Sequence, residues 1–347
     1  MNWRWKIKNI RDVAKAAGVS IATVSRVINN SGNVSSGKIN LVNDAIESLK
    51  YEPNIAARKL RNQNKLETGV ILAVIPNITN PFYNKILLGI SDVGLQLGMR
   101  VLVGNTNNNK DIEMQYMEML ASHKADGAIV MSTPCNSEYI SELANRFSIV
   151  QCAEYSIKYP LSCISIDNYL AARTAVKHLT DLGHERIAYI GADNLFISTK
   201  ERYRGYSDEL RANGIEPDAN ICLCADANYG YDSAVKTAKK LLTQKERPTA
   251  VFAISDVIGF AVIQTARELG ISVPDELSVI GFDNIELCKM SSPKLTTIDQ
   301  PRYEIGRLAV QVLNNEIMKA EATKRVQIFV KHKLVIREST KKLVNKG

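Results

Sequence analysis

The sequence lacks any apolar run of the roughly 18 to 20 residues that a membrane-spanning helix requires. Its basic start, MNWRWKIKNI, is not followed by the apolar segment of a secretory signal peptide. We therefore expect a cytoplasmic protein with no membrane partner.

Cysteine pairs with metal-ligand spacing are also missing. None of the six cysteines belongs to a CxxC pair, and most lie in apolar runs such as LSCISID, where a reduced thiol behaves as a small hydrophobic side chain. His178, His184 and Glu185 lie close in sequence, but the helix-breaking Gly183 separates the first from the other two. We therefore expect no metal and no other cofactor.

The common signatures of nucleotide-dependent enzymes and hydrolases are absent. The chain contains no GxGxxG, no GxxxxGK[ST] and no GxSxG. We therefore expect no enzyme. A solute-binding protein for transport is an alternative, although that class predicts a signal peptide and no basic N-terminal module.

The chain has an excess of positive charge, and this excess is confined to its N-terminal end. The net charge is +8; residues 1–65 contain 12 Lys and Arg against 4 Asp and Glu, whereas residues 66–347 contain 32 of each. This asymmetry predicts a small module that docks on a polyanion, joined to a neutral region with another task.

Three short helices are expected within the basic region, at about 11–17, 21–29 and 37–50. Gly18 supplies a left-handed turn between the first two, and Ser20 caps the second. The apolar positions expected to face one small core are Val13, Ala16, Ala17, Ile39, Val42, Ile46 and Leu49.

Two helices around such a glycine have the spacing of a helix-turn-helix, whose second helix lies in the major groove of DNA. Arg26 can bind guanine in a bidentate manner, while Ile21 and Ala22 offer apolar contact to a thymine methyl. The hydroxyl and amide groups expected on phosphates are those of Ser20, Thr23, Ser25 and Asn29. A plain helical hairpin with serine caps is the alternative.

After residue 68 the pattern changes to alternating strands and helices. The β-branched runs are GVILAVIP, MRVLVGNT, DGAIVMS, FSIVQCA, SCISID, RIAYIGA, ICLC, TAVFAIS and LSVIGFD. Most precede amphipathic segments of about 12 residues or more, which is typical of parallel sheets with helices on both faces. Because these strands are too many for one small sheet, we expect two α/β lobes with a ligand cleft between them.

The segments IRDVAKAAGVSIATVSRVINN, VS and AIESLKYEPNIAARKLR resemble the DNA-binding headpiece of the LacI/GalR family of bacterial transcriptional regulators. The resemblance continues through GVILAVIPNITNPFY, HLTDLGHERIAYIG, RYRGY, VPDELSVIGFD, LTTIDQP and VIREST. It implies an all-α helix-turn-helix headpiece and a two-lobed α/β core similar to periplasmic sugar-binding proteins. The implied divisions are an N-terminal extension (1–9), a helix-turn-helix domain (10–52), a hinge helix and linker (53–66), an effector-binding and dimerisation domain (67–340) and a tail (341–347).

This resemblance also implies roles in DNA binding. Ile21, Ala22 and Arg26 match the family's base-reading positions. The segment IAARKLR matches the hinge helix, with Leu60 as an apolar lever in the minor groove and Arg58 near phosphates. About eight isolated residues cannot hold a helix in water, so the hinge should be helical only when two copies meet on DNA.

Two features depart from the family pattern. Where the family usually has Thr-Arg at the start of the third helix, this chain has Lys38 and Ile39 after Gly37, so a phosphate contact is either lost or moved to Lys38. The residues before the usual family start include both tryptophans, Trp3 and Trp5. They are a misassigned start, a disordered tail or an added DNA-binding arm.

An effector site in the cleft is implied as well. Its expected residues are Phe82, Tyr83, Arg202, Tyr229, Ser255 and Asp283. Aromatic faces suit a sugar ring, and an arginine with a carboxylate suits its hydroxyl groups. Phe196 stands where purine-binding members have an arginine, which counts against a purine. The alternatives are a strand-end cap for Asp283, a core position for Tyr229 and a surface ion pair for Arg202.

The expected function is a sequence-specific transcriptional repressor controlled by a sugar-like effector. We expect a homodimer on a near-palindromic DNA operator, because the tail VIRESTKKLVNKG has no leucine heptads for a tetrameric coiled coil. A regulator that responds to a protein corepressor is the alternative.

Overall fold

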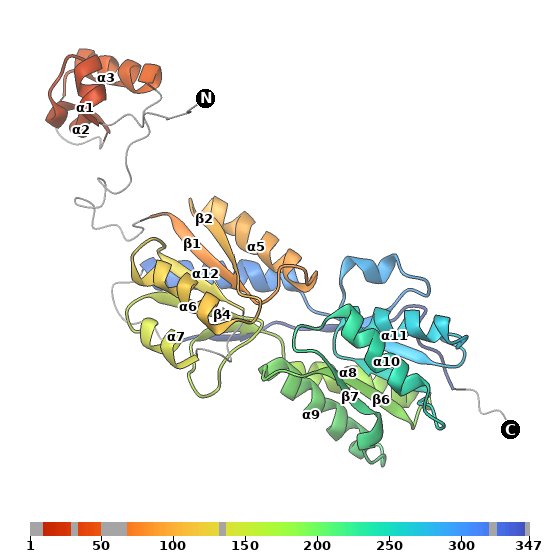
Figure 1. Ribbon diagram of the computed structural model, residues 1–347. Helices are drawn as coiled ribbons and strands as arrows, with labels where there is room; N and C mark the ends of the chain where they lie inside the picture. Colours follow the sequence, from red (N-terminus) through yellow and green to blue (C-terminus); the bar gives the residue numbers. More distant parts are fainter. Residues whose placement is uncertain (1–9, 29–33, 50–67, 132–136, 319–324, 344–347) are drawn as a thin grey trace. The chain divides into compact units, whose positions relative to one another are not determined.

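The computed structural model describes residues 10–28, 34–49, 68–131, 137–318 and 325–343. The chain divides into two compact units, Met1–Thr68 and Gly69–Gly347 (Figure 1). Within the described residues, no helix combines the length and apolar character needed to cross a lipid bilayer.

The N-terminal unit is built from three short helices, α1 (Ile10–Ala16), α2 (Ile21–Ile28) and α3 (Ser36–Leu49). Gly18 has a φ of 63°, which permits the turn between α1 and α2. The Ser20 hydroxyl accepts a 3.1 Å hydrogen bond from the backbone N–H of Thr23, and so caps α2 as expected.

The buried core of this unit consists of Val13, Ala14, Ala17, Val24, Val42 and Ala45. The prediction that Ala16 belongs to it is wrong, because Ala16 is exposed. Successive helical residues are rotated by roughly 100°, so Ala14 and Ala16 lie on opposite sides of the face that carries Val13 and Ala17. The core of this unit covers the side with Ala14 and leaves the side with Ala16 in solvent.

The C-terminal unit contains two six-stranded sheets flanked by helices, which form two lobes (Figure 1). In the first lobe the strand order is β11-β5-β4-β3-β1-β2, and in the second it is β12-β10-β9-β8-β6-β7. Every pairing is parallel except β10 with β12. The expected α/β architecture of two lobes is confirmed.

The first lobe comprises β1 (Val70–Ile75), α5 (Phe82–Gln96), β2 (Arg100–Asn105), α6 (Lys110–Ala121), β3 (Gly127–Val130), α7 (Ser137–Leu143), β4 (Ser148–Cys152), β5 (Ser162–Ser165), α12 (Arg302–Met318) and β11 (Gln327–Phe329). The second comprises α8 (Asn168–Asp181), β6 (Ile187–Ala192), α9 (Ile197–Ala212), β7 (Cys222–Ala225), α10 (Tyr231–Leu242), β8 (Ala250–Ala253), α11 (Asp256–Glu268), β9 (Ser278–Asp283), β10 (Thr296–Asp299) and β12 (Lys333–Val335). All nine predicted strands are present.

The described chain passes between the lobes three times: from β5 to α8, from β10 to α12 and from β11 to β12. The first lobe is therefore completed by α12 and β11, which follow the second lobe's central strands in sequence. Helix α12 packs against α5 and against strands β3, β4 and β5.

The contact between α5 and α12 is made backbone to backbone. A Cβ atom added to Gly306 would lie 2.1 Å from the carbonyl oxygen of Ile86, and one added to Gly89 would lie 2.2 Å from that of Tyr303. Only glycine permits this approach at either position, so the two helices form one closely packed pair.

Candidate functional site

Helix α2 presents the side chains that the sequence assigns to DNA. It buries Val24 completely and leaves Ala22 and Arg26 exposed, together with Ile21, which is 46% exposed. Ser20 is exposed, whereas Thr23 and Ser25 are partly buried. The hydroxyls of Ser20 and Thr23 lie 2.9 Å apart in a mutual hydrogen bond, so both are already engaged at the cap.

Some of the other residues assigned to DNA are among the described residues and some are not. Asn29, Arg58 and Leu60 fall outside the described residues, as do Trp3 and Trp5. Gly37 and Lys38, the departures from the family pattern, are exposed in the first turn of α3, and Ile39 is partly buried.

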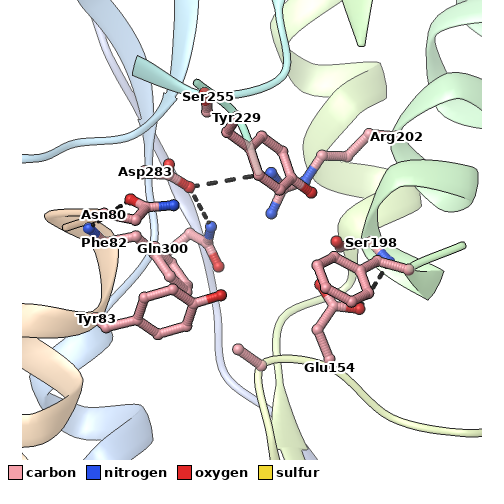
Figure 2. A pocket seen from close by; sticks show the side chains of 12 residues that line it. Asn80, Phe82, Tyr83, Glu154, Ser198, Arg202, Tyr229, Ser255, Asp283 and Gln300 are labelled. Carbon is pink, nitrogen blue, oxygen red and sulfur yellow. Dashed lines mark hydrogen bonds and ion pairs between the residues drawn. The ribbon is translucent and has the colours of Figure 1, made fainter. Parts of the chain in front are cut away.

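All six predicted effector residues line one pocket (Figure 2). The carboxyl ends of parallel strands meet at one edge of a sheet, and loops leaving that edge carry ligand-binding groups. Here helix α5, the element after β1, begins with Phe82 and Tyr83, and β9 ends at Asp283. The remaining lining residues are Asn80, Ala153, Glu154, Phe196, Ser198, Arg202, Tyr229, Ser255 and Gln300.

Arg202 is held firmly on the second-lobe side of the pocket. It is 6% exposed; its Nε donates to Asn168 Oδ1 at 2.9 Å and its Nη1 donates to the carbonyl of Ile254 at 2.7 Å. Its guanidinium carbon lies 3.8 Å from the centroid of the Phe282 ring. These contacts exclude the surface ion pair that the sequence left open for this residue.

Asp283 lies close to this guanidinium. Its Oδ1 is 4.0 Å from Arg202 Nη1 and accepts a 2.7 Å hydrogen bond from Gln300 Nε2 (Figure 2). Burial raises the pKa of the Asp283 carboxyl above its usual value, and the charge of Arg202 opposes this rise. Its φ of 115° is strained for a residue other than glycine, and such strain tends to be kept at functional sites.

Asp256, the first residue of α11, holds the segment that follows Asp283. It is fully buried and accepts hydrogen bonds from Thr297 Oγ1 at 2.6 Å and from the backbone N–H of Ile285 at 2.8 Å. Burial raises its pKa too. The bond to Ile285 fixes the backbone two residues after Asp283, and the bond to Thr297 holds the Asp256 side chain in place.

Aromatic side chains form much of the remaining wall. The rings of Phe82 and Tyr83 meet edge to face, with centroids 5.1 Å apart. The Tyr229 hydroxyl lies 3.0 Å from Thr199 Oγ1 in a hydrogen bond. Burial raises the pKa of both Tyr83 and Tyr229, so both phenols stay neutral and can donate.

Glu154, Ser198 and Gln300 also line the pocket, although the sequence did not single them out. Glu154 is buried, and its Oε2 accepts a 3.2 Å hydrogen bond from the backbone N–H of Ser198. Burial raises the pKa of the Glu154 carboxyl above its usual value. Glu154 follows the run FSIVQC, so the rule that polar residues after a buried strand gather at one sheet edge could have found it.

The histidines near the start of β6 are occupied elsewhere. His184 hydrogen-bonds through Nε2 to Ser278 Oγ at 3.0 Å and through Nδ1 to Thr249 Oγ1 at 3.0 Å. His178 Nε2 lies 3.0 Å from Thr340 Oγ1. No group of three His, Cys, Asp or Glu side chains suited to a metal ion occurs among the described residues.

Comparisons with known proteins agree with this architecture. A model of the lacI family of bacterial regulatory proteins matches residues 9–54, and a model of the periplasmic binding protein-like domain matches residues 176–340. Catabolite control protein A of Priestia megaterium is 34% identical over 334 residues, which cover 96% of this chain and 99% of that protein.

Two solved structures are similar over almost the whole chain. The lac repressor dimer bound to operator and the anti-inducer ONPF has a TM-score of 0.84 at 25% identity, covering 97% of this chain and 100% of that one. The complex of the transcriptional regulator CelR with cellobiose has a TM-score of 0.72 at 29% identity, covering 96% and 99%. This chain therefore belongs to the LacI family of transcriptional repressors, with an N-terminal DNA-binding helix-turn-helix and an effector-binding domain of the periplasmic-binding-protein type.

Proposed function

We propose that this chain acts in the cytoplasm as a homodimer that represses transcription from a near-palindromic operator, and that a neutral sugar-like molecule in the pocket controls its DNA affinity. The observation that carries the proposal is the convergence of charged, amide and aromatic side chains from both lobes on one pocket. A relative solved as a dimer on its operator and another solved with cellobiose support the two halves of the proposal.

The pocket chemistry favours a polyhydroxylated ligand. Arg202, Gln300 and the phenols supply donors, the carboxylates of Glu154 and Asp283 supply acceptors, and aromatic faces suit the C–H face of a sugar ring. Arg202 is the one cation among the described residues that line the pocket and Asp283 lies 4.0 Å from it, so little positive charge is left for a phosphorylated sugar in a site of low dielectric. Phe196 in the lining offers a purine no hydrogen bond.

The first test is selection of bound fragments from sheared genomic DNA, washed at two salt concentrations. Specific dimeric readout predicts a shared palindrome that survives the higher salt. Enrichment only at low salt, without a motif, would indicate electrostatic binding alone and would overturn the proposed operator readout under these conditions.

The Arg26→Ala variant is expected to bind the selected palindrome about 10- to 100-fold more weakly, because one bidentate base contact is worth about 1–3 kcal/mol. Binding to random DNA of the same length should fall much less. Lys38→Ala is the matched control. Because Lys38 is expected to contact a phosphate, its loss should weaken binding to both DNAs by a similar factor and lower the salt dependence of binding. Equal losses on both DNAs for Arg26→Ala would show that Arg26 does not read a base.

The effector is sought by thermal unfolding of the full chain with D-glucose, cellobiose, glucose 6-phosphate and adenosine as probes. A neutral sugar should raise the melting temperature and change operator affinity about 5- to 150-fold, the usual range of allosteric coupling. A response to the phosphate alone would overturn the proposed neutral ligand. If broader panels of sugars, phosphosugars and nucleosides all leave operator affinity unchanged, a protein corepressor replaces the small molecule.

The Glu154→Gln variant tests the buried carboxyl of the pocket. Because burial raises its pKa in the folded protein, Glu154 holds a proton there that the unfolded chain releases above about pH 4.3. Its contribution to stability is present below that value and is lost as the pH rises through the folded pKa. The melting temperature of the variant should therefore be about 2 °C or more above that of the unmodified chain at pH 8. At pH 4 the two melting temperatures should be equal.

The matched control for this effect is Glu118→Gln, a substitution at an exposed position on α6. It should change the melting temperature little at either pH. An equal shift at both pH values for Glu154→Gln would contradict the assignment of the effect to ionisation.

A further inference from the structure

Arg302 occupies the point where the chain passes from the second lobe to the first. It is the first residue of α12 and is 3% exposed. Its Nη2 donates a 2.6 Å hydrogen bond to the carbonyl of Asn284 in the second lobe, and its Nη1 donates a 3.4 Å hydrogen bond to the carbonyl of Pro81 in the first. One guanidinium therefore joins the two lobes.

Both carbonyls belong to pocket loops. Pro81 lies between Asn80 and Phe82, which line the first-lobe wall, and Asn284 follows Asp283, which lines the second-lobe wall. Any shift of either wall toward a ligand therefore moves an acceptor of Arg302.

The first-lobe side of this connection is stiff. Arg302 begins α12, and α12 is packed against α5 through Gly89 and Gly306, where no Cβ atom fits. Pro81 immediately precedes α5. Arg302 thus links the α5–α12 pair, as one body, to the second lobe.

The second-lobe side is anchored just as firmly. Asn284 Nδ2 donates to Asp299 Oδ1 at 2.8 Å, and Arg337 Nη2 donates to Asn284 Oδ1 at 2.6 Å. Asn284 has a φ of 55°, next to the strained Asp283. Two residues further on, Glu286 forms an ion pair with Lys85 of α5. The segment 283–286 therefore carries a pocket carboxylate and two connections to the α5–α12 pair.

Arg302 breaks two local rules, and both point to a functional role. A cation in the first turn of a helix opposes the helix dipole. Its Nε–H is buried without a hydrogen-bond partner among the described residues. An unsatisfied buried donor raises the free energy of this arrangement of the lobes. The free-energy difference between this arrangement and a second one is therefore smaller. Departures of this kind are expected where function requires them.

We propose that Arg302 is a positioning residue that couples the pocket to the relative orientation of the lobes, by binding the carbonyls beside Asp283 and Phe82 at once. The ion pair of Lys85 with Glu286 is a further, solvent-exposed connection between the segment 283–286 and the α5–α12 pair. This inference rests on the proposed function only in assigning an effector to the pocket.

The test is amide hydrogen exchange of the ligand-free full chain. Loss of a charged hydrogen bond predicts about tenfold faster exchange over 284–288 in Arg302→Met, with partial recovery in Arg302→Lys, which keeps the charge but not the fork. Arg307→Met is the matched control on the same helix, since Arg307 pairs with Glu304 one turn away. It should leave 284–288 unchanged.

Coupling between the lobes is tested by adding Asp283→Asn. In the presence of Arg302 this change should alter amide exchange over 82–86 in the other lobe, and in Arg302→Met it should not.

The ion pair is tested by small-angle scattering, in which Lys85→Glu should show slightly more open lobes. The double variant Lys85→Glu with Glu286→Lys should restore the lobe arrangement in part, because Lys289 also approaches Glu286.

Unchanged exchange over 284–288 in Arg302→Met would overturn the proposal, as would an equal rise in strands β1 and β6, which would indicate general destabilisation. Persistence of the Asp283→Asn effect without Arg302 would show that the signal takes another route. Because these measurements use no ligand and no DNA, their outcome is separate from the search for an effector.

Discussion

Gly306→Ala is expected to lower the free energy of unfolding of the C-terminal unit by about 3 kcal/mol. The added Cβ would lie 2.1 Å from the carbonyl oxygen of Ile86 and 3.1 Å from the backbone nitrogen of Ile90, so backbone, rather than a flexible side chain, must move. Helix α5 can retreat only by disturbing Ile86 and Ile90, both completely buried. Urea denaturation of the full chain measures the loss.

Gly37→Ala is the matched control, because Gly37 lies in α3 with no heavy atom within 4 Å of an added Cβ. It should stabilise the N-terminal unit by about 0.5–1 kcal/mol, since alanine is the better helix former. A decrease in the free energy of unfolding of less than about 1 kcal/mol for Gly306→Ala would contradict the backbone-to-backbone contact of α5 with α12.

Arg202→Met is expected to destabilise the C-terminal unit by about 3 kcal/mol at pH 8, because removing one partner strands a buried opposite charge. The methionine fills much of the volume but leaves Asn168 Oδ1 and the Ile254 carbonyl without their donor. The variant should also lose its response to any effector while keeping operator binding.

The loss in Arg202→Met should grow with pH. Arg202 opposes the rise in the pKa of Asp283, so without it that pKa rises further in the folded protein, while the unfolded value stays near about 3.9. The folded state then holds a proton that the unfolded chain releases, and stability falls as the pH rises above about 4. Thermal unfolding from pH 4 to pH 8 measures this slope.

Two further variants separate the causes of this effect. Adding Asp283→Asn to Arg202→Met should remove most of the added pH dependence. Arg204→Met, two residues along α9, removes an exposed pair with Glu201 and should cost little. A loss for Arg202→Met that is the same at pH 4 and pH 8 would show that packing, rather than the carboxylate, sets the effect.

Periodicity predicted the central strands because parallel strands are buried on both faces and so appear as continuous apolar runs. Strands β6 and β9, for example, are buried at every residue. The short strands β11 and β12 were not predicted, and neither was β10, whose sequence TTID has three polar residues out of four. The pairing of β11 with β5 and of β12 with β10 depends on chain crossings between the lobes, which no local pattern encodes.

The pocket was predicted largely through family resemblance rather than from local chemistry. Asp283 ends one buried strand and Glu154 follows another, so the same topological rule applies to both, although only Asp283 was singled out. Arg302 gives no such signal: an arginine after a proline at a helix start suggests an exposed cation. Its burial follows from the two lobes meeting around it, a property of the assembled fold.

The late position of α12 and β11 also has a consequence for biosynthesis. The helices of the N-terminal unit leave the ribosome first, whereas the first lobe cannot close until residues 302–329 have been translated. Until then the nascent chain exposes the apolar face of α5 that α12 covers, and uncovered apolar surface promotes aggregation. A message truncated before codon 302 should therefore yield an insoluble product rather than a DNA-binding protein that escapes regulation.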